Sequence, residues 1–470
     1  MNIFQTKELN GYEKTAQGRL CRHARGSRRA DVLLDGEKIA QVGHISPAEA
    51  KSAEVTDVSG CYLFPGFIDA HTHFDLDVCN TTTADDFASG TRSAIRGGTT
   101  TIIDFACPNK GETLAYGLDL WHKKADGKCS CDYGFHMTID DWNEGIEGEL
   151  DDMFAAGITS FKMYLTYPAM MIGDGAVYAA LKALKKRGGI AGVHCENAGV
   201  IDARIAELKA AGRAADVSAH PEARPDYLEA EAVARLLRIA EAADAPVIIV
   251  HLTNREALDE VALPAPAGRG SMSRPARSTL PRRRRVLRRQ LVHGRALCLR
   301  AAHPRRGKSA RALARSAPRR DPDHLHRPLL VHPRAEGHGP RGLHEDPRRS
   351  ARRGDARRGR LHRGVAAGRI DRRRNVPCPV RKSREALRLY PAKGVIAAGS
   401  DADIVVYDPK ASHILSARDM VTKAGYTPFE GLRTEGGIAK VYLRGSLMVE
   451  DGRIVGGPEG QYLRRGLCTL

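Results

Sequence analysis

Four histidines and one lysine occupy positions from which they could bind metal ions. His71 and His73 lie two residues apart in the segment FPGFIDAHTHFD, and alternate residues of a β-strand point to the same face. Two imidazoles on one face can bind one divalent cation. Lys162, His194 and His251 each lie at or near the end of a later apolar stretch. An HxH pair alone is more often two ordinary histidines, so the repetition at later strand ends is what predicts a metal site.

Lys162 lies between Phe161 and Met163, where burying a charged ammonium group would be costly. Desolvation favours the neutral amine, which can take up carbon dioxide to form a carbamate. The two carbamate oxygens could bridge two divalent cations about 3.5–4 Å apart. The structural alternative is a lysine whose ammonium group extends to solvent from a strand end.

The elements that must position these residues follow an α/β pattern. Strands are predicted at residues 99–105, 133–139, 159–165, 189–194 and 245–251, with helices between them at 177–186 and 228–243. Strands that alternate with helices predict parallel βα units. In an eight-stranded βα barrel, active-site residues lie at the C-terminal ends of the strands. We therefore expect a (β/α)8 TIM-type barrel over residues 65–389.

Both ends of the chain have the pattern of β-hairpins. Residues 30–43 (ADVLLDGEKIAQVG) contain two short apolar runs joined by an Asp-Gly turn. The pattern returns at residues 401–407 and 438–455. We expect these ends to form one small β-sandwich domain, built from residues 1–64 and 390–456, with 457–470 as a tail.

Length and composition restrict the class of protein. The 470 residues, 42% of them hydrophobic, are enough for a large core and two or three domains. No run of eighteen apolar residues occurs, and the start MNIFQTKELN lacks a basic segment followed by an apolar one. These features argue against membrane insertion and secretion. The ten cysteines show no CxxC spacing, which fits a reduced, cytoplasmic protein.

Positive charge is concentrated in one window. Residues 261–390 contain 35 Arg and 2 Lys against 8 acidic residues, a net charge of +29. Because the whole chain carries +18, the remaining residues carry −11. Residues 261–389 also contain no Phe, Trp or Tyr, so this window can hardly supply its share of a domain core.

Outside that window, over about residues 30–260 and 389–455, the chain resembles the cyclic amidohydrolases, and among them the dihydropyrimidinase and D-hydantoinase family. The motifs that carry the resemblance are PGFIDAHTHFD, GGTTTIIDF, DYGFHMTIDDW, GITSFKMYLTYP, GVHCEN, VIIVHLTN and LYPAKGVIAAGSDADIVVYDP. Dihydroorotases and allantoinases remain an alternative within the class. The dihydroorotase pattern HxHxR resembles the chain less, because Asp75 stands where that pattern has arginine.

The resemblance implies roles for particular residues. It implies two divalent cations of the zinc type, bound by four imidazoles and bridged by a carboxylated Lys162. The imidazoles are those of His71, His73, His194 and His251. Tyr167, in the stretch KMYLTY, corresponds to a phenol that hydrogen-bonds the developing oxyanion; the alternative is a tyrosine packed at the barrel mouth. His136 and His220 match no ligand position and are interpreted as structural.

The same resemblance implies a reaction and partners. The reaction is hydrolytic opening of a five- or six-membered cyclic diamide, a 5,6-dihydropyrimidine or a hydantoin, to an N-carbamoyl amino acid. The partners are this small-molecule substrate and further copies of the chain in a homotetramer, with neither nucleic acid nor membrane. Imidazole and carboxylate ligands accept zinc, manganese or cobalt, so the metal is left open.

One expected residue is missing. The family has an aspartate after the seventh strand, in a motif such as TDHC, and this chain has no such motif. Asp323 and His324 form a DH pair but follow no apolar strand. Permissible codons for residues 321–332, shifted by one base, spell IPTTCTDHCSF. We therefore hypothesise that residues 261–388 are read out of frame, which would corrupt strands seven and eight and leave the literal chain inactive.

A second hypothesis is a barrel-derived binding protein whose arginine-rich insertion binds nucleic acid. Nucleic-acid arms usually mix lysine with arginine and often interleave aromatic residues for stacking, and residues 261–389 do neither. A nucleotide read across codons 261–390 separates the two hypotheses, because insertions or deletions relative to a clean frame would exclude the binding protein.

Overall fold

A computed structural model describes residues 2–5, 20–23, 26–28, 30–46, 53–78, 81–262 and 387–467. Its helices are α2 Phe87–Arg96, α3 Leu114–Ala125, α4 Glu144–Gly148, α5 Leu150–Ala155, α6 Asp174–Lys186, α7 Ala198–Ala210, α8 Ala219–Ala223, α9 Asp226–Ala242, α10 Arg255–Ala262 and the 3-10 helix η4 Ala417–Asp419. Its strands are β1 Asn2–Gln5, β2 Leu20–His23, β3 Gly26–Arg28, β4 Asp31–Asp35, β5 Lys38–Gly43, β6 Glu54–Asp57, β7 Tyr62–Pro65, β8 Phe67–Thr72, β9 Asp77–Val78, β10 Thr81–Thr82, β11 Thr99–Ala106, β12 Asp132–Thr138, β13 Ser160–Tyr164, β14 Ile190–His194, β15 Val247–Ile249, β16 Ile404–Ile414, β17 Arg433–Leu443, β18 Ser446–Glu450 and β19 Arg453–Ile454.

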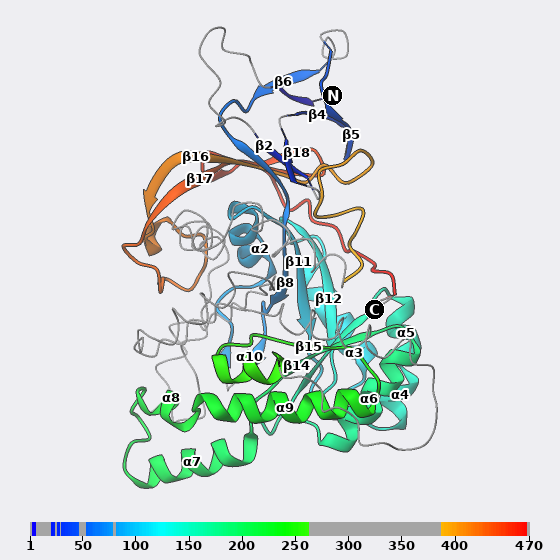
Figure 1. Ribbon diagram of the computed structural model, residues 1–470, viewed down its shortest axis with the longest axis vertical. Coiled ribbons are helices and arrows are strands. Elements are labelled where there is room, and N and C mark those ends of the chain that lie inside the picture. The colour runs from blue at the N-terminus through cyan, green and yellow to red at the C-terminus, as the bar shows by residue number, and fades with distance from the viewer. Residues whose placement is uncertain are drawn as a thin grey trace.

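A parallel sheet forms the centre of the protein (Figure 1). Its six described strands follow the order β15-β14-β13-β12-β11-β8, and every neighbouring pair is parallel. Each strand of this sheet therefore lies beside the strand of the sheet that follows it along the chain. At least one helix separates successive strands in the sequence. This confirms the predicted βα units and gives a half-barrel of the TIM type. The seventh and eighth strands of the expected barrel fall on residues outside the described ranges.

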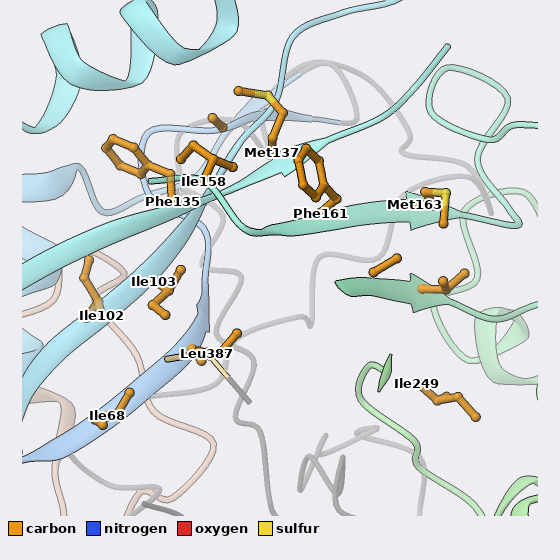
Figure 2. Packing of buried hydrophobic residues seen from close by; sticks show 14 of the residues in the cluster. Ile68, Ile102, Ile103, Phe135, Met137, Ile158, Phe161, Met163, Ile249 and Leu387 are labelled. Carbon is orange, nitrogen blue, oxygen red and sulfur yellow. The ribbon is translucent and has the colours of Figure 1, made fainter. Parts of the chain in front are cut away.

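The main buried cluster combines residues of this sheet and of its helices, and Figure 2 shows some of its strand residues. β11 and β12 are buried along their whole length, which explains why their sequences read as continuous apolar runs. Ile102, Phe135 and Phe161 each have 2% or less of their surface exposed and belong to one cluster. Burying each such side chain contributes about 1.5–3 kcal/mol. None of the helices in the described ranges is long and apolar enough to cross a membrane.

Two further sheets are built from the chain ends, and the second of them joins the two ends. The first has the order β5-β4-β1-β6 and the second β19-β18-β17-β16-β7-β2-β3. In the second, β7 from the N-terminal part pairs with β16 from the C-terminal part. Val32 and Ile39 of the first sheet share a buried cluster with Leu63 and Ile404 of the second. The predicted pairing of the two ends is therefore confirmed, and the sheets pack against each other on a common core.

Buried ion pairs connect this β region to the parallel sheet. The ammonium group of Lys393 contacts Asp132 at the start of β12 and lies 2.9 Å from Asp401 and 3.0 Å from Asp403. Asp132 also accepts from the Arg444 guanidinium. Several partners per charge offset the desolvation of each, so this network fixes the small domain on the N-terminal end of β12.

Candidate metal and active site

The ends of β8 and β11 fix the first two histidines. His71 lies within β8, whereas His73 lies one residue beyond its end. The prediction placed both histidines in one strand, so it is correct for His71 and one residue off for His73. The Asp104 carboxylate, on β11, accepts hydrogen bonds from the Thr72 hydroxyl and, at 3.1 Å, from the Phe74 amide. Because these donors flank His73 on both sides, Asp104 holds the backbone that carries this imidazole.

The four imidazoles converge from three parts of the sheet. The Nε2 atoms of His71 and His73 lie 3.3 Å apart. The ring centroid of His251 lies 5.7 Å from that of His71 and 4.4 Å from that of His194. His194 is the last residue of β14. His251 was predicted to end a strand, but β15 ends at Ile249 and His251 has a φ of 39°, so a turn aims its ring toward the other histidines.

Lys162 lies inside the sheet beside them. It occupies β13, and none of its surface is exposed to solvent. Its Nζ lies 4.8 Å from the Tyr164 ring centroid and 5.6 Å from that of Phe105. The side chain therefore does not extend to solvent, and the structural alternative for this lysine is wrong. Complete removal from water favours the neutral amine, which is the form that can react with carbon dioxide.

Tyr167 has a strained backbone next to the histidines. Its φ of 69° lies in the left-handed region, which costs a non-glycine residue about 1–3 kcal/mol. The Tyr167 carbonyl accepts from the amides of Met170 and Met171, both at 2.8 Å. This turn places the phenol ring 5.1 Å from the His194 ring, between centroids. The strained backbone conformation thus directs the Tyr167 ring toward the imidazoles.

Glu196 is a partner of His194 that the sequence analysis did not assign. Nε2 of His194 lies 2.8 Å from Oε2 of Glu196, and both side chains are buried. An ionised carboxylate only accepts hydrogen bonds, so Nε2 carries the proton and Nδ1 keeps its lone pair. This is the arrangement in which a carboxylate orients a metal-binding imidazole. The signal was present, since Glu196 follows His194 by two residues in GVHCEN.

Burial also perturbs titratable groups around the site. Burial raises the pKa of the Asp140 carboxyl, which follows β12, to about 8, although the positive charge of Lys110 lowers it. Burial likewise raises the pKa of the Cys107 and Cys195 thiols. These cysteines stay protonated at neutral pH, and the thiolate is the nucleophilic form. The site is therefore not built for cysteine nucleophilic catalysis.

The donor set fits divalent cations of the zinc type. Four buried imidazoles and an amine able to become a carbamate are the nitrogen and oxygen ligands that zinc, manganese and cobalt accept. Within the described ranges, no three His, Cys, Asp or Glu side chains close on a single point at metal-binding distance. Lys162, which would supply oxygen ligands as a carbamate, is not among those residue types.

The other histidines of the sequence analysis have different surroundings. His136 is buried in β12, 2.6 Å from the Ser160 hydroxyl and 2.9 Å from the Ala70 carbonyl, as a structural histidine would be. His220 lies in the short helix α8 and is partly buried. Asp323 and His324 lie outside the described residues.

Known proteins are similar to this chain in sequence and in fold. The sequence profile of the amidohydrolase family matches residues 62–260. A D-hydantoinase of Streptomyces coelicolor is 35% identical over 454 residues, covering 93% of this chain and 95% of the relative. The solved D-hydantoinase from Bacillus sp. AR9 superposes with a TM-score of 0.85 at 29% identity, over 97% of this chain and 99% of that one. A dihydropyrimidinase from Brevibacillus agri gives 0.82 at 29%, over 96% and 98%.

The match to the amidohydrolase family, carried on a parallel βα sheet, places the chain in the class of amidohydrolases. Within that class, the chain belongs to the dihydropyrimidinase and D-hydantoinase family. The family resemblance given by the sequence motifs is therefore confirmed.

Proposed function

We propose that this enzyme opens the ring of cyclic diamides, 5,6-dihydropyrimidines or hydantoins, to N-carbamoyl amino acids. The observation that carries the proposal is the convergence of four imidazoles from β8, β14 and the turn after β15, beside a fully buried lysine of β13 that shares a contact to Phe105 with His71. The similar D-hydantoinases and the dihydropyrimidinase, which share its sequence and fold, support this substrate class.

Two divalent cations of the zinc type belong to the proposal. His71, His73, His194 and His251 would hold them, with Lys162 as a bridging carbamate. When bound, such cations supply Lewis acidity that polarises an amide carbonyl. Two further residues of this chain orient the imidazoles. Glu196 fixes the tautomer of His194, and Asp104 fixes the backbone around His73.

Tyr167 is the remaining residue of the described ranges with a proposed role in the reaction. Water addition to the ring carbonyl places negative charge on its oxygen, and a phenol donating a hydrogen bond stabilises that charge. The strained turn at Tyr167 holds its ring beside His194 in advance of the reaction. The aspartate that would transfer a proton to the leaving nitrogen falls, by the family resemblance, in residues outside the described ranges.

The homotetramer and the cytoplasmic location stay predictions, and light scattering of the purified protein tests the first.

Ring opening is measured directly. A protein with the frame repaired across residues 261–388, incubated with zinc or manganese, should convert dihydrouracil or a 5-substituted hydantoin to its N-carbamoyl product, detected by mass. A second preparation, the literal chain, tests the frame hypothesis, which expects turnover from the repaired protein alone. If both preparations bind two metals per chain and neither opens either ring, the proposed substrate class is wrong.

A further inference from the structure

The C-terminal segment, predicted as a tail, lies along β12 and reaches the N-terminal edge of the parallel sheet. The Leu463 amide donates to the Tyr133 carbonyl at 2.7 Å, and the Tyr133 amide donates to the Gln461 carbonyl at 3.0 Å. Further along, the Arg465 amide donates to the Gly157 carbonyl at 3.2 Å. Figure 1 shows this segment descending in red beside β12 toward α5.

Two glycines show how closely the segment is seated. A Cβ atom added to Gly460 would lie 2.1 Å from the Cys131 carbonyl oxygen, and one added to Gly157 would lie 2.6 Å from Cα of Arg464. Both contacts involve backbone, which cannot move aside as a side chain can. The path of the segment is therefore fixed from Gly460 up to Arg465.

Arg465 is buried although it is charged. Only 4% of its surface is exposed. Its guanidinium donates to the Ser160 hydroxyl at 2.6 Å and to the Phe135 carbonyl. Both acceptors are neutral, and burial lowers the pKa of the guanidinium to about 10. Placing a cation here is costly, so the contacts it makes are the feature to explain.

Those contacts begin a chain of hydrogen bonds with a single possible direction. The Ala70 carbonyl can only accept, so Nε2 of His136 carries a proton. Burial and then the charge of Arg465 lower the pKa of His136 well below its ordinary value, so the ring is neutral and Nδ1 accepts. The Ser160 hydroxyl must therefore donate to Nδ1, which leaves its oxygen to accept from Arg465.

The far end of this chain lies at the candidate metal site. Ala70 immediately precedes His71 in β8. The Phe105 ring stacks on His136 at 4.6 Å and on His73 at 4.8 Å, between centroids. His136 is thus connected to the strand carrying His71 by a hydrogen bond and to the ring of His73 by an aromatic stack.

We propose that Arg465 is a positioning residue that, through Ser160 and His136, fixes β8 and its two histidines for metal binding. The C-terminal segment thereby contributes to the site although it lies at the opposite edge of the sheet. The metal-binding part of this inference rests on the proposed function. The fixing of β8 does not, because it concerns contacts within the chain.

The test uses Arg465→Met and Ser160→Ala in the full chain. The first removes the start of the hydrogen-bond chain, and the second interrupts it while leaving the C-terminal segment seated. Arg464→Met is the matched control, since Arg464 is exposed and its guanidinium donates to the Ala155 carbonyl, outside the hydrogen-bond chain. Amide hydrogen exchange of residues 67–74 in metal-free protein should rise roughly 10-fold in both test variants and stay unchanged in the control.

Zinc binding gives a second readout. Each test variant should raise the zinc dissociation constant roughly 10-fold, and the double variant no more than either alone, because both act on one chain of contacts. Unchanged exchange at 67–74 in Ser160→Ala, or additive effects in the double variant, would overturn the proposal. Exchange that responds as expected, together with a frame-repaired protein that has no ring-opening activity, would support this inference and count against the proposed function.

Discussion

Nε2 of His194 lies 2.8 Å from Oε2 of Glu196, with both side chains buried. Since the carboxylate accepts the Nε2 proton, the lone pair of the imidazole is on Nδ1. Glu196→Gln replaces that acceptor with an amide and removes the negative charge. We expect zinc affinity to fall roughly 10- to 100-fold, as measured by competition with a chelating dye. Glu231→Gln, at an exposed carboxylate, is the control. Equal affinity in both variants would make Glu196 a packing residue.

Lys162→Ala in a frame-repaired protein tests the bridging carbamate. The amine is the only group at this position that can take up carbon dioxide, so its loss should weaken metal binding by roughly 100-fold or more and abolish most turnover. Short carboxylic acids should restore part of the activity by occupying the place of the carbamate. Lys182→Ala, on the exposed face of α6, should change nothing. Two metals per chain and normal turnover in Lys162→Ala would exclude the bridging role.

Tyr167→Phe, in the same frame-repaired protein, removes one hydrogen-bond donor and no metal ligand. We expect kcat to fall by roughly 100-fold while metal content stays constant. Tyr178→Phe, at a partly exposed position on α6, is the matched control. Steady-state kinetics with dihydrouracil, together with metal analysis, measure both effects. An unchanged kcat would return Tyr167 to the alternative of a tyrosine packed at the barrel mouth.

The parallel sheet could be predicted because its strands are buried on both faces and therefore appear as apolar runs. The error at His251 has a local cause. The sequence VIIVH continues the apolar pattern, whereas the chain turns at His251 with a positive φ, two residues after β15 ends. Periodicity reports burial, and burial continues past the end of the strand.

Supporting residues were harder to find than candidate ligands. Asp104 carries a recognisable signal, a lone carboxylate inside the apolar run TTTIIDF, because a buried charge needs partners. Arg465 carries none. Its partners Ser160 and Phe135 lie more than 300 residues away in sequence, and the segment around it has the composition of an ordinary polar terminus. Contacts of this kind arise only once the sheet and the C-terminal segment are placed together.

His136 gives the protein a predictable dependence of stability on pH. Burial, followed by the charge of Arg465, lowers the pKa of His136 well below 6.5 in the folded state. Between that low pKa and about 6.5, the unfolded chain binds the proton that the folded chain excludes. The free energy of unfolding should therefore fall as the pH decreases below about 6.5, by up to about 1.4 kcal/mol per pH unit from this residue.

His136→Gln keeps a polar side chain at this position without a titrating ring. Urea unfolding of the metal-free protein at pH 7.5, 6.5 and 5.5 measures the effect. The variant should be less stable than the parent protein at pH 7.5, because the chain from Ser160 to Ala70 is disturbed, but should lose less stability on acidification, so the two curves converge. His44→Gln, at an exposed histidine, should leave the slope of the parent protein unchanged. Parallel curves for His136→Gln and the parent protein would show that His136 takes up its proton without unfolding.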